Sequence, residues 1–157
     1  MANKVKPVPD GHHTVTPYLA VKNAAKALEF YQRGFGATET YRRTLPDGRV
    51  GHAEIRLGDS IIMLADEFPE YGFKAAQTLG GSSVNIHLYV EDVDAFVKRA
   101  VSAGARERTP VMDQFYGDCS GQLEDPFGHL WWVATHKEDV PPEEMKKRVE
   151  AKFGQNA

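Results

Sequence analysis

The fold is decided by residues 80–96, which read Gly80-Gly81-Ser82-Ser83-Val84-Asn85-Ile86-His87-Leu88-Tyr89-Val90-Glu91-Asp92-Val93-Asp94-Ala95-Phe96. Glycine and serine open the stretch, and an alternating run over 84–90 predicts a strand. Apolar residues at helical spacing then predict a helix over 93–103, and Gly104 ends it. The same strand-to-helix pattern begins at Thr14, so the chain starts over at residue 80.

An internal duplication follows from aligning TPYLAV (16–21) with NIHLYV (85–90), an offset of 85 − 16 = 69 residues. Each copy continues with a helix that ends in Gly-Ala and then with three strands separated by turn residues. The first copy is predicted as strand 14–21, helix 24–35 and strands 39–44, 50–57 and 60–66. The second is predicted as strand 84–90, helix 93–103 and strands 106–112, 115–123 and 129–135. We therefore predict an α+β fold of two βαβββ modules that form a cupped, mixed-sheet domain.

The predicted domain spans residues 13–136, with modules at about 13–66 and 83–136. Residues 1–12 read as an irregular arm, and residues 137–157 as a C-terminal helix with Pro141 in its first turn. Residues 67–82 form a long loop with three aromatic residues and flanking glycines. Such a loop is often a lid, although a disordered surface loop is the alternative.

Composition bounds the function. The 157 residues carry a net charge of −3 without a basic stripe, which argues against nucleic acid as a partner. The longest apolar run, Ile61 to Ala65, is too short to span a membrane, and no secretory signal is visible at the N-terminus. The single cysteine, Cys119, excludes an internal disulfide, so we expect a cytoplasmic protein.

Three segments resemble the vicinal oxygen chelate superfamily: PYLAVKNAAKALEFYQRGFGA, GHAEIRLGDSIIMLADE and LEDPFGHLWWV. The resemblance covers about residues 13–136. It is closest to the glyoxalase/bleomycin-resistance/dioxygenase branch, and within it to the PhnB-like subgroup. It implies paired modules that curl into a cup, commonly in a homodimer, and a divalent metal that holds two substrate oxygens.

Strand alternation places one set of side chains on the cup face. In the strand over 84–90, Ile86 and Leu88 suit the face packed on a helix, so Asn85, His87 and Tyr89 face the cup. The same logic places Thr16, Tyr18, Met63 and Trp132 on this face. The predicted ligand-binding residues are Thr16, Tyr18, Met63, Asn85, His87, Tyr89 and Trp132.

The metal positions that the resemblance implies fall on Thr16, Met63, Asn85 and Trp132. Zinc, nickel, iron and manganese prefer His, Glu, Asp or Cys, so we expect no metal at these four positions and no cofactor. His52, Glu54 and His87 are candidates for an acid/base group or an altered metal site. The alternative is that His52 and Glu54 pair across strands and His87 hydrogen-bonds in the sheet. His129, His136 and Cys119 are expected to be structural.

Two functions remain open. In the first, the cup binds a small aromatic or planar molecule without the family metal, as bleomycin-resistance proteins do. In the second, the protein is a lyase, isomerase or dioxygenase that uses an altered divalent metal site or a His/Glu acid/base pair. A homodimer is expected in either case, because the sheet edges need partners. A third and weaker possibility is a protein–protein module that has lost its cup function.

Overall fold

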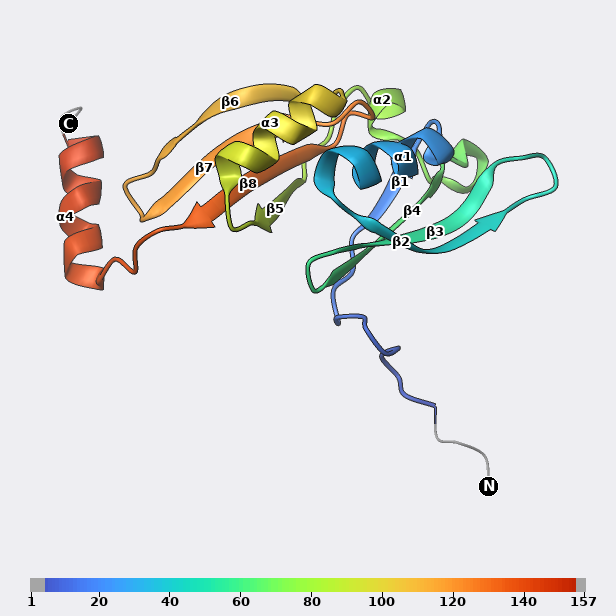
Figure 1. Ribbon diagram of the computed structural model, residues 1–157, viewed down its shortest axis with the longest axis horizontal. Helices are drawn as coiled ribbons and strands as arrows, with labels where there is room; N and C mark the ends of the chain where they lie inside the picture. The colour runs from blue at the N-terminus through green and yellow to red at the C-terminus, as the bar shows by residue number, and fades with distance from the viewer. Residues whose placement is uncertain (1–4, 155–157) are drawn as a thin grey trace.

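The computed structural model describes residues 5–154, which form two βαβββ modules lying side by side (Figure 1). The elements of the first module are β1 (Tyr18–Val21), α1 (Ala24–Phe35), β2 (Thr38–Thr44), β3 (Val50–Leu57) and β4 (Ser60–Asp66). Those of the second are β5 (Asn85–Tyr89), α3 (Val93–Ala103), β6 (Arg106–Asp113), β7 (Asp118–Glu124) and β8 (Leu130–His136). The strand orders are β1-β4-β3-β2 and β5-β8-β7-β6, so the α+β fold and its duplication are confirmed.

Equivalent side chains begin the two helices. Asn23 accepts a hydrogen bond from Lys26 N at 3.1 Å, and Asp92 accepts one from Ala95 N at 3.0 Å. Both are favourable N-cap residues. A residue on the last strand of each module accepts a hydrogen bond from the first amide of the helix. Asp66 accepts from Ala24 N and Thr135 Oγ1 accepts from Val93 N, each at 2.9 Å.

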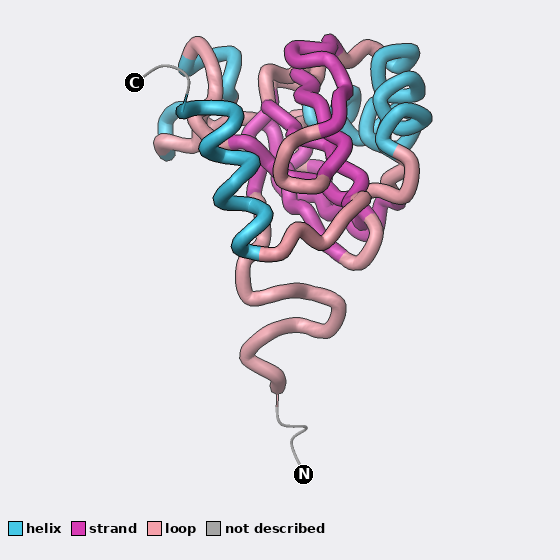
Figure 2. The backbone as a smooth tube through the Cα atoms, turned by 90° about the vertical axis from the view of Figure 1, so that its left-hand side faces the viewer, coloured by secondary structure: helices cyan, strands magenta, loops and turns pink. Residues whose placement is uncertain are grey.

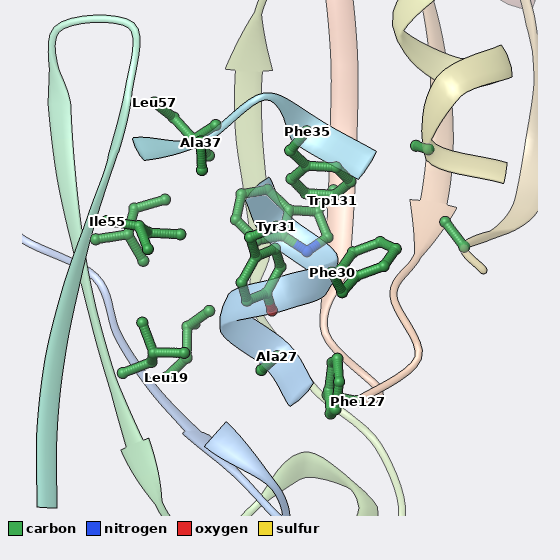
Figure 3. Close-up of a cluster of buried hydrophobic side chains, with 14 of the residues drawn as sticks. Leu19, Ala27, Phe30, Tyr31, Phe35, Ala37, Ile55, Leu57, Phe127 and Trp131 are labelled. Carbon is green, nitrogen blue, oxygen red and sulfur yellow. The ribbon is translucent and has the colours of Figure 1, made fainter. Parts of the chain in front are cut away.

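One continuous core joins the modules, because α1 and α3 pack against each other and each covers its own sheet. Tyr31 and Phe35 of α1 contact Trp131 of β8, with ring centroids 5.7 and 4.9 Å apart (Figure 3). Asp125, buried in the turn before β8, accepts hydrogen bonds from the Tyr31 hydroxyl and, at 2.9 Å, from Trp131 Nε1. This polar contact fixes the two modules relative to each other.

The strand predicted from Thr14 begins only at Tyr18, because Pro17 has no amide proton for the ladder and the preceding residues turn instead. The strand predicted from residue 115 likewise begins at Asp118, after a turn closed by Gly117 N and Gln114 O. The other helices and strands of the two modules lie within two residues of their predicted bounds.

The segment between the modules is more ordered than a structureless loop. It contains a 3-10 turn, η1 (Pro69–Tyr71), and a short helix, α2 (Ala76–Leu79). Glu67 ties it together, accepting hydrogen bonds from Ala75 N at 3.0 Å and from the Thr78 hydroxyl. The ring of Phe73 lies 5.0 Å from that of Tyr18, so this segment borders the cup face of the first module.

The C-terminal helix, α4 (Pro142–Phe153), lies at one end of the molecule, and Figure 2 shows it from that side. Arg148 reaches back from it to the Phe115 carbonyl at 3.2 Å and to both oxygens of Glu138. Phe153 packs on Phe115 with ring centroids 5.7 Å apart. The helix therefore contacts its own chain, although Val149 and Phe153 are still 39% and 57% exposed. No helix within residues 5–154 is long and apolar enough to cross a membrane.

Candidate functional site

Each sheet has one face on the helices and one face free, as alternation along the strands predicts. In β1, Leu19 and Val21 are buried in the core, whereas Tyr18 is 46% exposed on the other face. In β5, Ile86 and Leu88 pack against the core, whereas Asn85, His87 and Tyr89 are exposed. The free faces of the two sheets therefore carry the candidate residues.

A cavity of about 540 Å³ lies between β1 and β5, the edge strands of the two sheets. Its volume is in the range of small-molecule sites, and its lining is mostly apolar with a few polar groups. The lining residues are Val15, Pro17, Tyr18, Leu19, Ser82, Val84, Asn85, Ile86, His87, His129 and Leu130. The cavity thus joins the same strand from each copy of the duplication.

A second, more polar cavity of about 380 Å³ lies on the free face of the first sheet, lined by His12, His52 and Glu54 among others. The Tyr18 hydroxyl is 3.0 Å from His52 Nδ1, and His52 Nε2 is 3.2 Å from Glu54 Oε1. The other oxygen of Glu54 is 3.2 Å from His12 Nε2, which is buried and has no partner aligned as a hydrogen bond. These contacts form a row of four side chains in the order His12, Glu54, His52 and Tyr18. Because Tyr18 also lines the 540 Å³ cavity, the row ends at that cavity.

Histidine 12 was missed by sequence reasoning, which assigned residues 1–12 to an irregular arm without a role. The structure folds this part of the arm onto the first sheet, so that the His12 side chain is only 15% exposed. The one available signal was the pair His12-His13 directly before the first strand, and an arm without periodicity does not reveal where it lies.

The predicted ligand-binding residues divide into groups. Tyr18, Asn85 and His87 line the 540 Å³ cavity together. Met63 and Trp132 lie on the neighbouring strands, opposite Tyr18 and His87 respectively. Thr16 lies before β1, where its hydroxyl donates to the His13 carbonyl at 3.2 Å.

Tyr89 is not in this cavity. It is 65% exposed and lines a separate cavity of about 470 Å³, next to the turn between β3 and β4. The three acid/base candidates also separate: His52 and Glu54 are in contact, whereas His87 lies on β5 with its ring 4.7 Å from that of Tyr89.

The four family metal positions do not fit a metal. Thr16, Met63, Asn85 and Trp132 offer a hydroxyl, a thioether, an amide and an indole, which are not the donors that catalytic transition metals take in proteins. Asn85 is moreover engaged, since its Oδ1 accepts from Gln122 Nε2 at 2.6 Å. Within residues 5–154, no group of three His, Cys, Asp or Glu side chains is arranged to hold a metal ion.

His129, His136 and Cys119 make contacts within the fold, and His129 also lines the 540 Å³ cavity. His129 Nε2 lies 3.0 Å from the Ala20 carbonyl and so links the second module to β1. His136 lies 2.7 Å from Asp118 and 2.9 Å from Asp139, and hydrogen bonds to these two carboxylates raise its pKa. Burial raises the pKa of the Cys119 thiol, which disfavours the nucleophilic thiolate form.

Comparison with known proteins gives a consistent picture. The family model described as glyoxalase/bleomycin resistance protein/dioxygenase superfamily matches residues 11–133. An uncharacterized protein of Mycobacterium tuberculosis is 40% identical over 135 residues, which cover 84% of this chain and 79% of the relative.

Solved structures agree with the fold. A gene product of Arabidopsis thaliana is 30% identical with a TM-score of 0.63, covering 78% of this chain and 98% of that one. TioX from Micromonospora is 26% identical with a TM-score of 0.63, covering 79% of this chain and 98% of that one.

Proposed function

The chain belongs to the glyoxalase/bleomycin resistance protein/dioxygenase superfamily, and from that premise we propose that it binds a small aromatic or planar molecule in the cavity between β1 and β5. The observation that carries the proposal is the lining of this cavity, where apolar side chains surround the Tyr18 and His87 rings. A planar molecule buries most area against such walls and stacks favourably on aromatic rings. The PhnB-like subgroup and a cytoplasmic location are part of this proposal, on the segments and the single cysteine described above.

Binding is tested first by Trp fluorescence. Trp132 lies opposite His87, next to the cavity, so a planar ligand should change its emission saturably. A library of planar molecules that produces no saturable change would remove the main support for the proposal.

The site is then tested by blocking it. Val84 lines the cavity and is 63% exposed, so Val84→Trp should fill the cavity without disturbing the core. We expect calorimetry to show at least a tenfold weaker Kd, about 1.4 kcal/mol, for a ligand found in the library. Leu79→Trp is the matched control, because Leu79 is 65% exposed and does not line the cavity. Equal affinities of the two variants would place the ligand elsewhere.

Binding is proposed to be independent of a metal, because the family positions carry the wrong donors. Protein purified without chelator should contain less than about a tenth of a divalent metal per chain, and EDTA should leave the ligand Kd unchanged. Stoichiometric metal, with ligand binding lost in EDTA, would favour the enzyme alternative with an altered metal site. The other enzyme alternative, an acid/base pair, is favoured by one observation, the contact between His52 and Glu54.

We also propose a homodimer with the cups at or near the subunit interface. Both β1 and β5 are edge strands, and the exposed side chains at β5 include Tyr89 within the strand and Val84 directly before it. Unpaired edges and apolar groups of this kind favour association.

A further inference from the structure

Tyr18 connects the cavity between the two modules with the polar cavity of the first module. Its ring lines the apolar cavity between β1 and β5, and its hydroxyl is 3.0 Å from His52 Nδ1 in the polar cavity. Behind His52 lie Glu54 and then His12, each contact being 3.2 Å. A ligand in the apolar cavity therefore meets one end of a row of titratable groups.

The partners of His52 define where its proton lies. Glu54 is a carboxylate, which only accepts hydrogen bonds, so the imidazole places its N–H on Nε2. Nδ1 is then the unprotonated nitrogen, and it accepts from the Tyr18 hydroxyl. This order, hydroxyl to imidazole to carboxylate, is that of a hydrolase triad with tyrosine in place of serine and with the roles of the two imidazole nitrogens exchanged.

We propose that Tyr18, His52 and Glu54 form a proton-transfer site for a planar ligand that carries an enolic or phenolic oxygen. The ligand O–H bond breaks and its proton passes to the Tyr18 oxygen, while the Tyr18 proton passes to His52 Nδ1. Tyr18 ends neutral, the ligand becomes an oxyanion, and His52 becomes an imidazolium beside the Glu54 carboxylate. The reverse path returns the proton. This inference rests on the proposed function, since the ligand must occupy the β1–β5 cavity.

The surroundings suit this role. Partial burial raises the pKa of Tyr18, and the nearby positive charge of Arg43 lowers it by less, so Tyr18 remains a phenol near neutral pH. It can therefore donate a hydrogen bond to the ligand oxyanion. The Tyr41 ring lies 5.9 Å from the His52 ring, and Asp10 and Arg56 line the same polar cavity as His52.

His12 is a positioning residue. Its Nε2 lies beside the second oxygen of Glu54, leaving the first oxygen to His52, and its Nδ1 lies 3.4 Å from the Asp10 carbonyl. The contact of His12 with Glu54 also ties the N-terminal arm to the site. In the alternative, the contacts among His12, Glu54 and His52 only hold the arm in place, and no proton moves to or from a ligand.

The first test needs no ligand. Nitrogen-15 NMR of the histidine side chains should find His52 protonated on Nε2 and unprotonated on Nδ1 when neutral. A neutral His52 with its proton on Nδ1 would overturn the inference, since Nδ1 could not then accept from Tyr18.

The second test uses 4-nitrophenol, a planar phenol whose phenolate is yellow and whose phenol is colourless. Bound to the wild-type protein, it should show a higher phenolate fraction than free in the same buffer. The bound phenolate-to-phenol ratio should fall about tenfold in Tyr18→Phe and in Glu54→Gln, one unit of pKa. Tyr41→Phe is the matched control and should keep the wild-type ratio, because Tyr41 touches the same imidazole but does not line the larger cavity.

The outcomes separate the two proposals. Binding with the wild-type phenolate ratio in both variants would overturn the proton-transfer site and leave the binding function standing. Absence of 4-nitrophenol binding would count against the proposed function, and the NMR result would then decide the Tyr18–His52–Glu54 arrangement by itself. Circular dichroism of each variant checks that it is folded.

Discussion

At the scale of single residues, two buried carboxylates, Asp66 and Asp125, hold neighbouring elements together through hydrogen bonds. Asp66 accepts hydrogen bonds from Ala24 N and from Val50 N, and Asp125 accepts four, two from backbone amides and two from side chains. A buried carboxylate is stable only when its oxygens are satisfied in this way. Asp125 is the more consequential of the two because its partners come from both modules.

Asp125→Ala should lower the free energy of unfolding by roughly 2–4 kcal/mol, because it leaves buried donors without an acceptor. Tyr31→Phe removes one donor and should cost only about 1 kcal/mol, since Asp125 keeps its other partners. Urea unfolding measures both. If the two substitutions lowered the free energy of unfolding equally, the Tyr31–Asp125 hydrogen bond between the modules would account for the whole loss, and the hydrogen bonds of Asp125 within the turn before β8 would contribute nothing measurable.

His136 gives a pH-dependent contribution to stability. Hydrogen bonds to Asp118 and then Asp139 raise its pKa above 6.5, so the folded state favours the imidazolium. The stabilisation is therefore complete below pH 6.5 and is lost as the pH rises through the raised pKa. Melting temperatures of the wild type and His136→Gln should differ most at acidic pH and converge at alkaline pH. A constant difference across this range would contradict the assignment.

At the scale of elements, the bounds of both module helices were predictable, whereas the starts of two strands, β1 and β7, were not. Asn23 and Asp92 cap the helices and glycines end them, so both helices have their predicted bounds. These signals are local. The first strand begins four residues later than predicted, at Tyr18. Apolar and β-branched residues indicate a strand, but its start depends on where it pairs with β4, which a local pattern does not reveal. The contact of His12 with Glu54 spans more than forty residues, and no local pattern encodes it.

The segment 67–82 remains the predicted lid. Its Glu67 contacts hold α2 against the rest of the segment, and Phe73 borders Tyr18. Glu67→Gln should speed hydrogen exchange at Ala75 and in α2 without changing exchange in β3 or β4. Exchange in the wild-type segment as slow as in those strands would argue against a mobile lid.

For α4, Arg148→Met should speed exchange along the helix, because it removes the contacts with Glu138 and the Phe115 carbonyl. Truncation after His136 tests whether the helix also crosses to a partner. Since Arg148 and Phe153 attach the helix to Phe115 of its own chain, we expect the truncated protein to remain a dimer with a lower melting temperature. Conversion to a monomer would show that α4 forms part of the interface.

At the scale of the whole molecule, the duplication has diverged in chemistry while keeping its topology. Tyr18 and His87 occupy equivalent positions at an offset of 87 − 18 = 69, opposite Met63 and Trp132. The free face of the first module carries Tyr18, His52 and Glu54, which contact one another in a row. The free face of the second module contributes Asn85 and His87 to the cavity, together with apolar Val84 and Leu130.

The homodimer is a prediction about the assembled protein. One chain has a mass of 17.5 kDa. Light scattering of the full chain well above micromolar concentration should give twice this mass. A monomer under these conditions would defeat the prediction, and the exposed face of the second sheet would then need another explanation.

The most direct test of the central claim is a crystal structure of the protein grown with a planar ligand identified by fluorescence and with added Zn²⁺ or Ni²⁺. The account predicts the ligand between β1 and β5, in contact with Tyr18 and His87, and no metal at the four family positions. A ligand bound outside this cavity, or a metal coordinated by any two of Thr16, Met63, Asn85 and Trp132, would contradict it.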